Sequence, residues 1–156
     1  MKNKLVLTGF VFAILLLVSL LAFAGDAFGG KVTAVRSAEI VVVNYGRGEY
    51  VVRIVGVAAP AEGPIANEAK EFVTKMVLGQ EVRARFEGKN PNGEMVSRLY
   101  VGDPGKDVAL ELLRNGLARR PQGPDYQFGY KYGELTKAEN EARENKRGLW
   151  AAAQPK

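Results

Sequence analysis

The sequence predicts an α+β domain that is mainly β: a five-stranded barrel accompanied by three helices. Hydrophobic residues make up 47% of the 156 residues and charged residues 25%, which is the balance of a globular domain with a packed core. Segments with two-residue alternation, typical of half-buried strands, are interrupted once by a segment with helical spacing. Two further helical segments follow the last strand. We therefore expect the element order βββ-α-ββ-α-α.

Residues 1–24 precede this domain and have the pattern of an export segment. Two lysines stand before an apolar run over 5–24, which ends in the small-x-small triplet Ala22-Phe23-Ala24 that signal peptidase accepts. We expect a signal peptide that is cleaved before Gly25. The run is also long enough to span a bilayer, so an uncleaved membrane anchor is the alternative. Both the signal peptide and the anchor predict an exported domain that is periplasmic, secreted or anchored on the outer side. Residues 25–30 are expected to form a linker.

Three strands are expected in the first part of the domain. Alternating residues over 31–36 and 39–44 predict two strands with a short polar break between them. Turn residues over 44–48, followed by a run of β-branched residues over 49–57, predict a hairpin and a third strand.

Helical spacing begins after the third strand. An apolar stripe over 65–78 predicts an amphipathic helix, and Gly79 is placed where a C-terminal cap is expected. Alternation returns over 80–86 and 95–101. The segment 88–93 between them contains Pro and Gly, which cannot extend a ladder, so a second hairpin is predicted.

Two helices complete the domain. Asp107 is the expected N-cap of a short helix that closes on Gly116, and residues 134–147 form the last helix. Five strands with a helix between the third and the fourth fit a Greek-key barrel of the OB type, in which that helix closes one end. We expect the domain to end at residue 150 and a tail over 151–156.

The composition limits the chemistry that this domain can perform. The chain has no Cys and no His, which excludes thiol nucleophiles, disulfides, Cys- or His-ligated zinc and imidazole acid–base catalysis. Any chemistry must come from carboxylates, Arg, Lys or Tyr. The net charge is +5, and removal of residues 1–24 leaves 20 basic against 17 acidic residues, a charge of only +3.

Three motifs across residues 31–150 resemble the staphylococcal-nuclease-like (thermonuclease) family. Arg53-Ile-Val-Gly-Val-Ala-Ala-Pro60 is similar to the family's Arg-Leu-x-Gly-Ile-Asp-x-Pro-Glu at the exit of the third strand. Asn115-Gly-Leu-Ala118 follows the short helix as in the family. The last helix, with Ala138-Glu139 and Ala142-Arg143, runs to a closing Gly148-Leu-Trp150, which is also typical of the family.

The resemblance implies a calcium-dependent endonuclease site whose parts are mostly missing here. The family cleaves phosphodiesters with calcium on two Asp carboxylates, a third carboxylate that positions water, and two Arg that bind the phosphate. The corresponding positions are Ala38, Ala58 and Ala61 for the carboxylates, and Arg53 and Glu94 for the arginines. Calcium needs several hard oxygen ligands, so we expect no metal ligands and no cofactor.

Two acids stand next to the lost carboxylates. Glu39 and Glu62 each lie one residue away from such a position, and a one-residue shift in an extended segment turns a side chain to the opposite face. We therefore expect solvated carboxylates and not a rebuilt calcium site. Arg53 is the retained catalytic position, although a structural pairing with a carboxylate or carbonyl is the interpretation that we favour.

A basic and aromatic surface is the second candidate site. Arg83 and Arg85 share one face of the fourth strand, and Arg98 lies on the strand beside it. Aromatic residues alternate between Tyr126 and Tyr132. Such rings in a positive groove can stack the bases of single-stranded nucleic acid; alternatively, the rings cover the barrel and the arginines are solvated. The binding candidates are Arg83, Arg85, Arg98, Arg119, Tyr126 and Tyr130.

Three functions are therefore open. We favour an exported pseudoenzyme, a catalytically inactive module that binds a protein or cell-envelope partner, with a membrane partner only if the leader is uncleaved. The second is a weak, salt-sensitive binder of single-stranded nucleic acid, against which the charge of +3 argues. The third is a calcium-dependent phosphodiesterase with a site relocated to Glu39 or Glu62.

Overall fold

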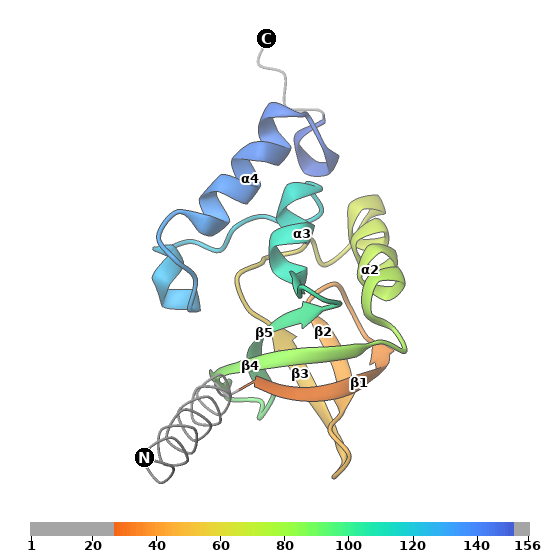
Figure 1. Cartoon of the computed structure of the whole chain (residues 1–156). Helices are drawn as coiled ribbons and strands as arrows, with labels where there is room; N and C mark the ends of the chain where they lie inside the picture. Colours follow the sequence, from red (N-terminus) through yellow and green to blue (C-terminus); the bar gives the residue numbers. More distant parts are fainter. Residues whose placement is uncertain (1–26, 152–156) are drawn as a thin grey trace, which may run out of the picture.

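Six strands form one sheet in the order β3-β2-β1-β4-β5-β6 in the computed structural model, which describes residues 27–151 (Figure 1). A parallel pairing between β3 and β5, with Val52 opposite Met95, closes the first five strands into a barrel. The strands are β1 (Ala27–Val35), β2 (Ile40–Asn44), β3 (Glu49–Ile54), β4 (Glu81–Lys89), β5 (Met95–Val101) and the short β6 (Lys106–Asp107). The predicted five-stranded barrel is confirmed.

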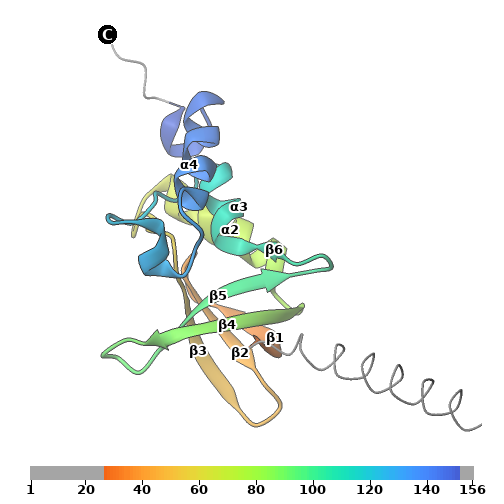
Figure 2. The same cartoon turned by 60° about the vertical axis from the view of Figure 1, so that its left-hand side comes forward.

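The helices stack at one end of this barrel, while the β2–β3 hairpin projects at the other (Figures 1 and 2). They are α2 (Pro64–Val77), α3 (Val108–Arg114) and α4 (Glu134–Glu144), with short 3-10 helices η1 (Asp125–Phe128) and η2 (Gly148–Trp150). Helix α2 stands between β3 and β4, as predicted. No helix within residues 27–151 is long and apolar enough to cross a membrane.

Strand β1 begins earlier than the alternation predicts. Residues 27–30, which we expected in a linker, pair with β4 from Ala27 opposite Arg85 to Gly30 opposite Val82. Glycines carry no side chain to show alternation, which hid this part of the strand. A Cβ on Gly30 would lie 2.7 Å from the carbonyl oxygen of Asn44, so the close approach of β2 requires glycine here.

The core joins the inward-facing strand residues to the apolar stripe of α2. Val41, Val52 and Leu99 are fully buried inside the barrel, and Ala69 and Val73 of α2 pack into the same cluster. Burial of a Val or Leu side chain is worth about 1.5–3 kcal/mol, so the stripe fixes α2 on the barrel. The loop that leads from β3 to this helix is thereby held against the β1–β2 turn.

Two of the motifs in the second half of the chain contact each other. Gly116 ends α3 with φ 68°, and its carbonyl oxygen accepts a hydrogen bond of 2.9 Å from the backbone N–H of Leu149. A Cβ on Gly116 would collide with the carbonyl of Arg147, and one on Gly148 would collide with Gly116. Glycine is therefore required at both positions, because the two backbones are in direct contact where α3 meets η2.

Candidate functional site

Three segments that are distant in the sequence meet at the side chain of Arg53. Glu39 lies in the turn between β1 and β2, Arg53 lies in β3, and Glu94 immediately precedes β5. Arg53 donates from Nη1 to Oε2 of Glu39 at 3.0 Å and from Nε to Oε2 of Glu94 at 2.8 Å. The three side chains are between 16% and 33% exposed. We call these residues the Arg53 ion cluster.

Both carboxylates of the cluster are held by further donors. Oε1 of Glu39 accepts a hydrogen bond of 2.6 Å from the backbone N–H of Ala59, which ties the β1–β2 turn to the loop after β3. Oε2 of Glu94 accepts a second hydrogen bond, from Nδ2 of Asn90 at 2.6 Å. The hydrogen bonds from Arg53 and Asn90 hold the pKa of Glu94 below its ordinary value.

The structure corrects the expected orientation of two neighbouring residues. Ala38, which the resemblance places at a metal-ligand position, is 4% exposed and packs in the hydrophobic core. Glu39, which we expected to be turned away and solvated, is the residue that contacts Arg53. Glu62, Ala58 and Ala61 are exposed in the loop that follows β3.

A cavity of about 460 Å³ opens beside the cluster. Its lining includes Glu39, Ala59, Ala61 and Lys70, so a carboxylate and a cation face it together with methyl groups. Within residues 27–151 no group of three or more Asp, Glu, His or Cys side chains is placed to hold a metal ion.

The six predicted binding residues do not form one surface. Arg83, Arg85 and Arg119 are exposed, and the guanidinium carbon of Arg119 lies 5.1 Å from the centre of the Trp150 ring. Arg98 is 7% exposed and Tyr130 is 4% exposed. The side chain of Tyr126 lies outside the part of the chain that the structure describes.

Arg98 and Tyr130 are packing partners. Nε of Arg98 donates to Glu87 at 2.9 Å, and its guanidinium carbon lies 5.1 Å from the centre of the Tyr130 ring. The alternative interpretation of the aromatic row, that its rings cover the barrel, therefore holds for Tyr130. An exposed surface that includes Arg98 and Tyr130 is excluded by this burial.

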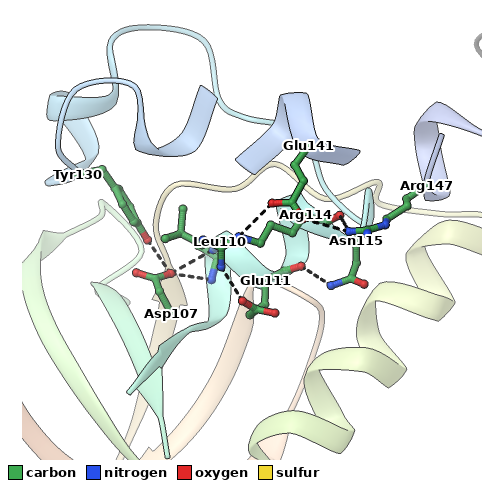
Figure 3. Close-up of polar contacts among 9 residues, drawn as sticks. Asp107, Leu110, Glu111, Arg114, Asn115, Tyr130, Glu141 and Arg147 are labelled. Carbon is green, nitrogen blue, oxygen red and sulfur yellow. Dashed lines mark hydrogen bonds and ion pairs between the residues drawn. The ribbon is translucent and has the colours of Figure 1, made fainter. Parts of the chain in front are cut away.

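Asp107 anchors Tyr130 at the start of α3 (Figure 3). Its Oδ1 accepts hydrogen bonds from the backbone of Ala109 at 2.9 Å and Leu110 at 3.1 Å, which confirms the predicted N-cap. The Tyr130 hydroxyl donates to the same oxygen at 3.1 Å. Burial raises the pKa of Asp107. The contact shows a structural role for Tyr130 that residue spacing alone could not reveal.

Ion pairs at the C-terminal end of α3 join this helix to α4 and to the segment that follows it (Figure 3). Arg114 of α3 pairs with Glu111 at 2.6 Å and with Glu141 of α4 at 3.6 Å, and Glu141 also pairs with Arg147 at 3.4 Å. These charges are engaged within the domain, so this end of α3 is part of the scaffold.

Comparison with known proteins decides the family. The family model described as staphylococcal nuclease homologue matches residues 51–152. The chain belongs to the staphylococcal nuclease family. It is 32% identical over 110 residues to a probable endonuclease LCL3 of Phaeosphaeria nodorum, covering 64% of this chain and 37% of that protein. It is 33% identical over 105 residues to the staphylococcal-like nuclease CAN1 of Arabidopsis thaliana, covering 67% and 30%.

A third relative is ribonuclease TUDOR 2 of Arabidopsis thaliana, 33% identical over 91 residues, which cover 56% of this chain and 9% of the relative. The chain thus spans less than two fifths of the length of these relatives. The family match supports a nuclease-domain fold for this chain.

The Arg53 ion cluster predicts a pH-dependent stability. Because the folded state lowers the pKa of Glu94, its stabilising contribution is present above the ordinary carboxyl pKa and is lost as the pH falls through the lowered value. The Glu94→Gln variant is expected to unfold at lower urea concentration than the wild type at neutral pH. This difference should shrink below about pH 4.

Urea-induced unfolding over a pH series measures this difference. Glu62→Gln is the matched control, because Glu62 is exposed, and we expect it to follow the wild type at every pH. A difference between Glu94→Gln and the wild type that does not change with pH would contradict the role given to the Glu94 charge.

Proposed function

We propose that this chain is an exported, catalytically inactive member of the staphylococcal nuclease family that works as a binding module for a protein or cell-envelope partner. The observation that carries the proposal is the Arg53 ion cluster, in which the guanidinium lies between the carboxylates of Glu39 and Glu94. A phosphate group would have to compete with both carboxylates for this cation. The apolar run over 5–24 supports export, as a signal peptide or as an anchor.

The same cluster argues against a calcium site. Calcium takes six to eight oxygen ligands, and Glu39 and Glu94 are the acids beside Arg53. Their oxygens accept hydrogen bonds from Arg53, Ala59 and Asn90, and the guanidinium charge opposes a second cation at this place. The donor set therefore does not fit calcium.

Glu94 adds a second obstacle. Transition states of phosphoryl transfer are stabilised by fixed cations aimed at the phosphate oxygens, and here a carboxylate with a lowered pKa stands where the family resemblance implies the second arginine. It is ionised at neutral pH and repels an anionic substrate. Nuclease activity, which the names of the relatives indicate for those proteins, is therefore not proposed for this chain.

The test is a calorimetric titration with calcium, run beside a cleavage assay on single-stranded DNA. The wild-type protein is expected to give no saturable heat of calcium binding and no cleavage that a chelator abolishes. Cleavage that requires calcium, stops with a chelator and is lost in Arg53→Ala would overturn the proposal. It would direct attention to Glu39, the carboxylate that reaches Arg53 at 3.0 Å.

A further inference from the structure

The end of the barrel at the β2–β3 hairpin is lined by aromatic side chains. The rows of buried residues along the strands point into the barrel, and they continue at this end as Phe28 after Val32, Tyr50 after Val52 and Phe86 after Ala84. They surround a cavity of about 610 Å³. We call this end the aromatic mouth; its lining residues are Phe28, Tyr45, Arg47, Tyr50, Phe86, Lys89 and Met95.

The rings of the mouth are exposed although they point inward. Phe28 is 54% exposed, Tyr50 is 43% exposed and Phe86 is 39% exposed. Tyr45 lies between two of them, with ring centres 6.5 Å from Phe28 and 5.6 Å from Tyr50. The helices stack at the opposite end of the barrel (Figure 2). A contiguous exposed aromatic surface of this kind is typical of a site that binds a protein, a membrane or a ligand.

The apolar N-terminal run joins the domain at this mouth. The run over 5–24 ends three residues before Ala27, the first residue of β1, and four before Phe28. A fully extended chain covers at most about 14 Å over four residues. A bilayer that holds residues 5–24 would therefore lie within that distance of the Phe28 backbone.

The polar residues of the mouth suit an anionic surface. Arg47 and Lys89 stand among the aromatic rings, and the residues that line the mouth include no acid. Tyrosines with their rings at the headgroup level, together with Lys and Arg, are typical of protein surfaces at a membrane interface. Each Lys or Arg near an anionic leaflet contributes attraction that salt weakens.

We propose that the aromatic mouth docks onto the surface of an anionic lipid bilayer, with residues 5–24 retained as the anchor. Phe28, Tyr50 and Phe86 enter the interface, and Arg47 and Lys89 contact the headgroups. The helices then point away from the membrane. The inference deepens the proposed function: it names the bilayer as the cell-envelope partner and rests on the proposed export. It does not depend on whether the domain cleaves nucleic acid.

The absence of cysteine from the chain allows a clean labelling experiment on the full-length protein. Cell-free synthesis with vesicles of phosphatidylcholine and phosphatidylglycerol avoids signal peptidase. A fluorophore is attached to Glu49→Cys in the hairpin beside the mouth, or to Asn140→Cys in α4 at the far end of the molecule (Figure 1). Both positions are exposed. Brominated lipids are expected to quench the label at Glu49→Cys several-fold more than the label at Asn140→Cys.

The double substitution Phe28→Ser with Phe86→Ser tests the role of the rings. It should reduce quenching at Glu49→Cys toward the value at Asn140→Cys, whereas Leu78→Ser, which removes an exposed apolar side chain outside the mouth, should leave quenching unchanged. Circular dichroism checks that each variant is folded. Equal quenching at the two labels, or quenching that the double substitution does not change, would overturn the proposal. A label at Glu49→Cys that responds to oligothymidylate and not to lipid would overturn it in favour of a nucleic-acid surface.

Discussion

The Ala38→Asp variant is expected to lose about 1–3 kcal/mol of its free energy of unfolding at neutral pH. Ala38 is 4% exposed and packs in the barrel core at the edge of the cavity of about 460 Å³. A carboxylate forced into this buried position is either charged at a cost or kept neutral by a raised pKa. The penalty grows as the pH rises through that raised pKa and diminishes in acid. A substitution meant to restore a metal ligand would thus damage the fold.

Ala58→Asp is the matched control for this prediction. Ala58 is exposed, and its backbone already forms a bridge with Arg119 through its N–H and carbonyl groups. A carboxylate placed there remains in water, so the change in stability should stay within about 0.5 kcal/mol. Chemical denaturation of the two variants measures the contrast. Equal stability of Ala38→Asp and Ala58→Asp would show that Ala38 does not face the core.

Residue patterns predicted the barrel because its signals are local. Alternation in β2 to β5, the stripe of α2 and the cap at Asp107 each depend on neighbours in the sequence, and each is found in the structure. The orientation of Glu39 does not follow the alternation of the strands on either side. The backbone N–H groups of Arg36 and Ser37 both donate to the carbonyl of Ile40, so this segment is a turn. The alternation rule for extended strands does not apply there.

The burial of Arg98 had no local signal either. Along β5, Ser97 and Leu99 face the core, so Arg98 faces outward on the sheet, as predicted. The segment that carries Tyr130 covers that outer face, and Glu87 of β4 supplies the counter-charge. The residues of β5 alone cannot predict this burial, because the covering residues near Tyr130 come much later in the sequence. Arg83 and Arg85, which the cover does not reach, are exposed as predicted.

Combined substitution of Ala58→Asp, Ala61→Glu and Glu94→Arg is expected to create calcium-dependent cleavage of single-stranded DNA. Glu39 pairs with Arg53 at 3.0 Å and accepts a hydrogen bond from Ala59, so it can serve as one calcium carboxylate only by giving up these contacts. Ala58→Asp supplies the second carboxylate. Ala61→Glu supplies the carboxylate that positions water. Glu94→Arg removes one partner of Arg53 and adds the missing phosphate-binding cation. Loss of one such fixed donor costs about 10²–10³ in rate, so the triple variant should cleave at least about a hundredfold faster than the double variant that keeps Glu94.

Single substitutions are expected to remain inactive, because one carboxylate cannot hold calcium and each defect alone is sufficient to abolish cleavage. Chelation of calcium should abolish the activity of the triple variant. Addition of Arg53→Ala to the triple variant should abolish the activity even when calcium is present. A folded triple variant that binds calcium but fails to cleave would show that the phosphate or water position is misassigned. A triple variant that binds no calcium would show that Glu39, which pairs with Arg53 at 3.0 Å, and Ala58→Asp do not form a calcium site together.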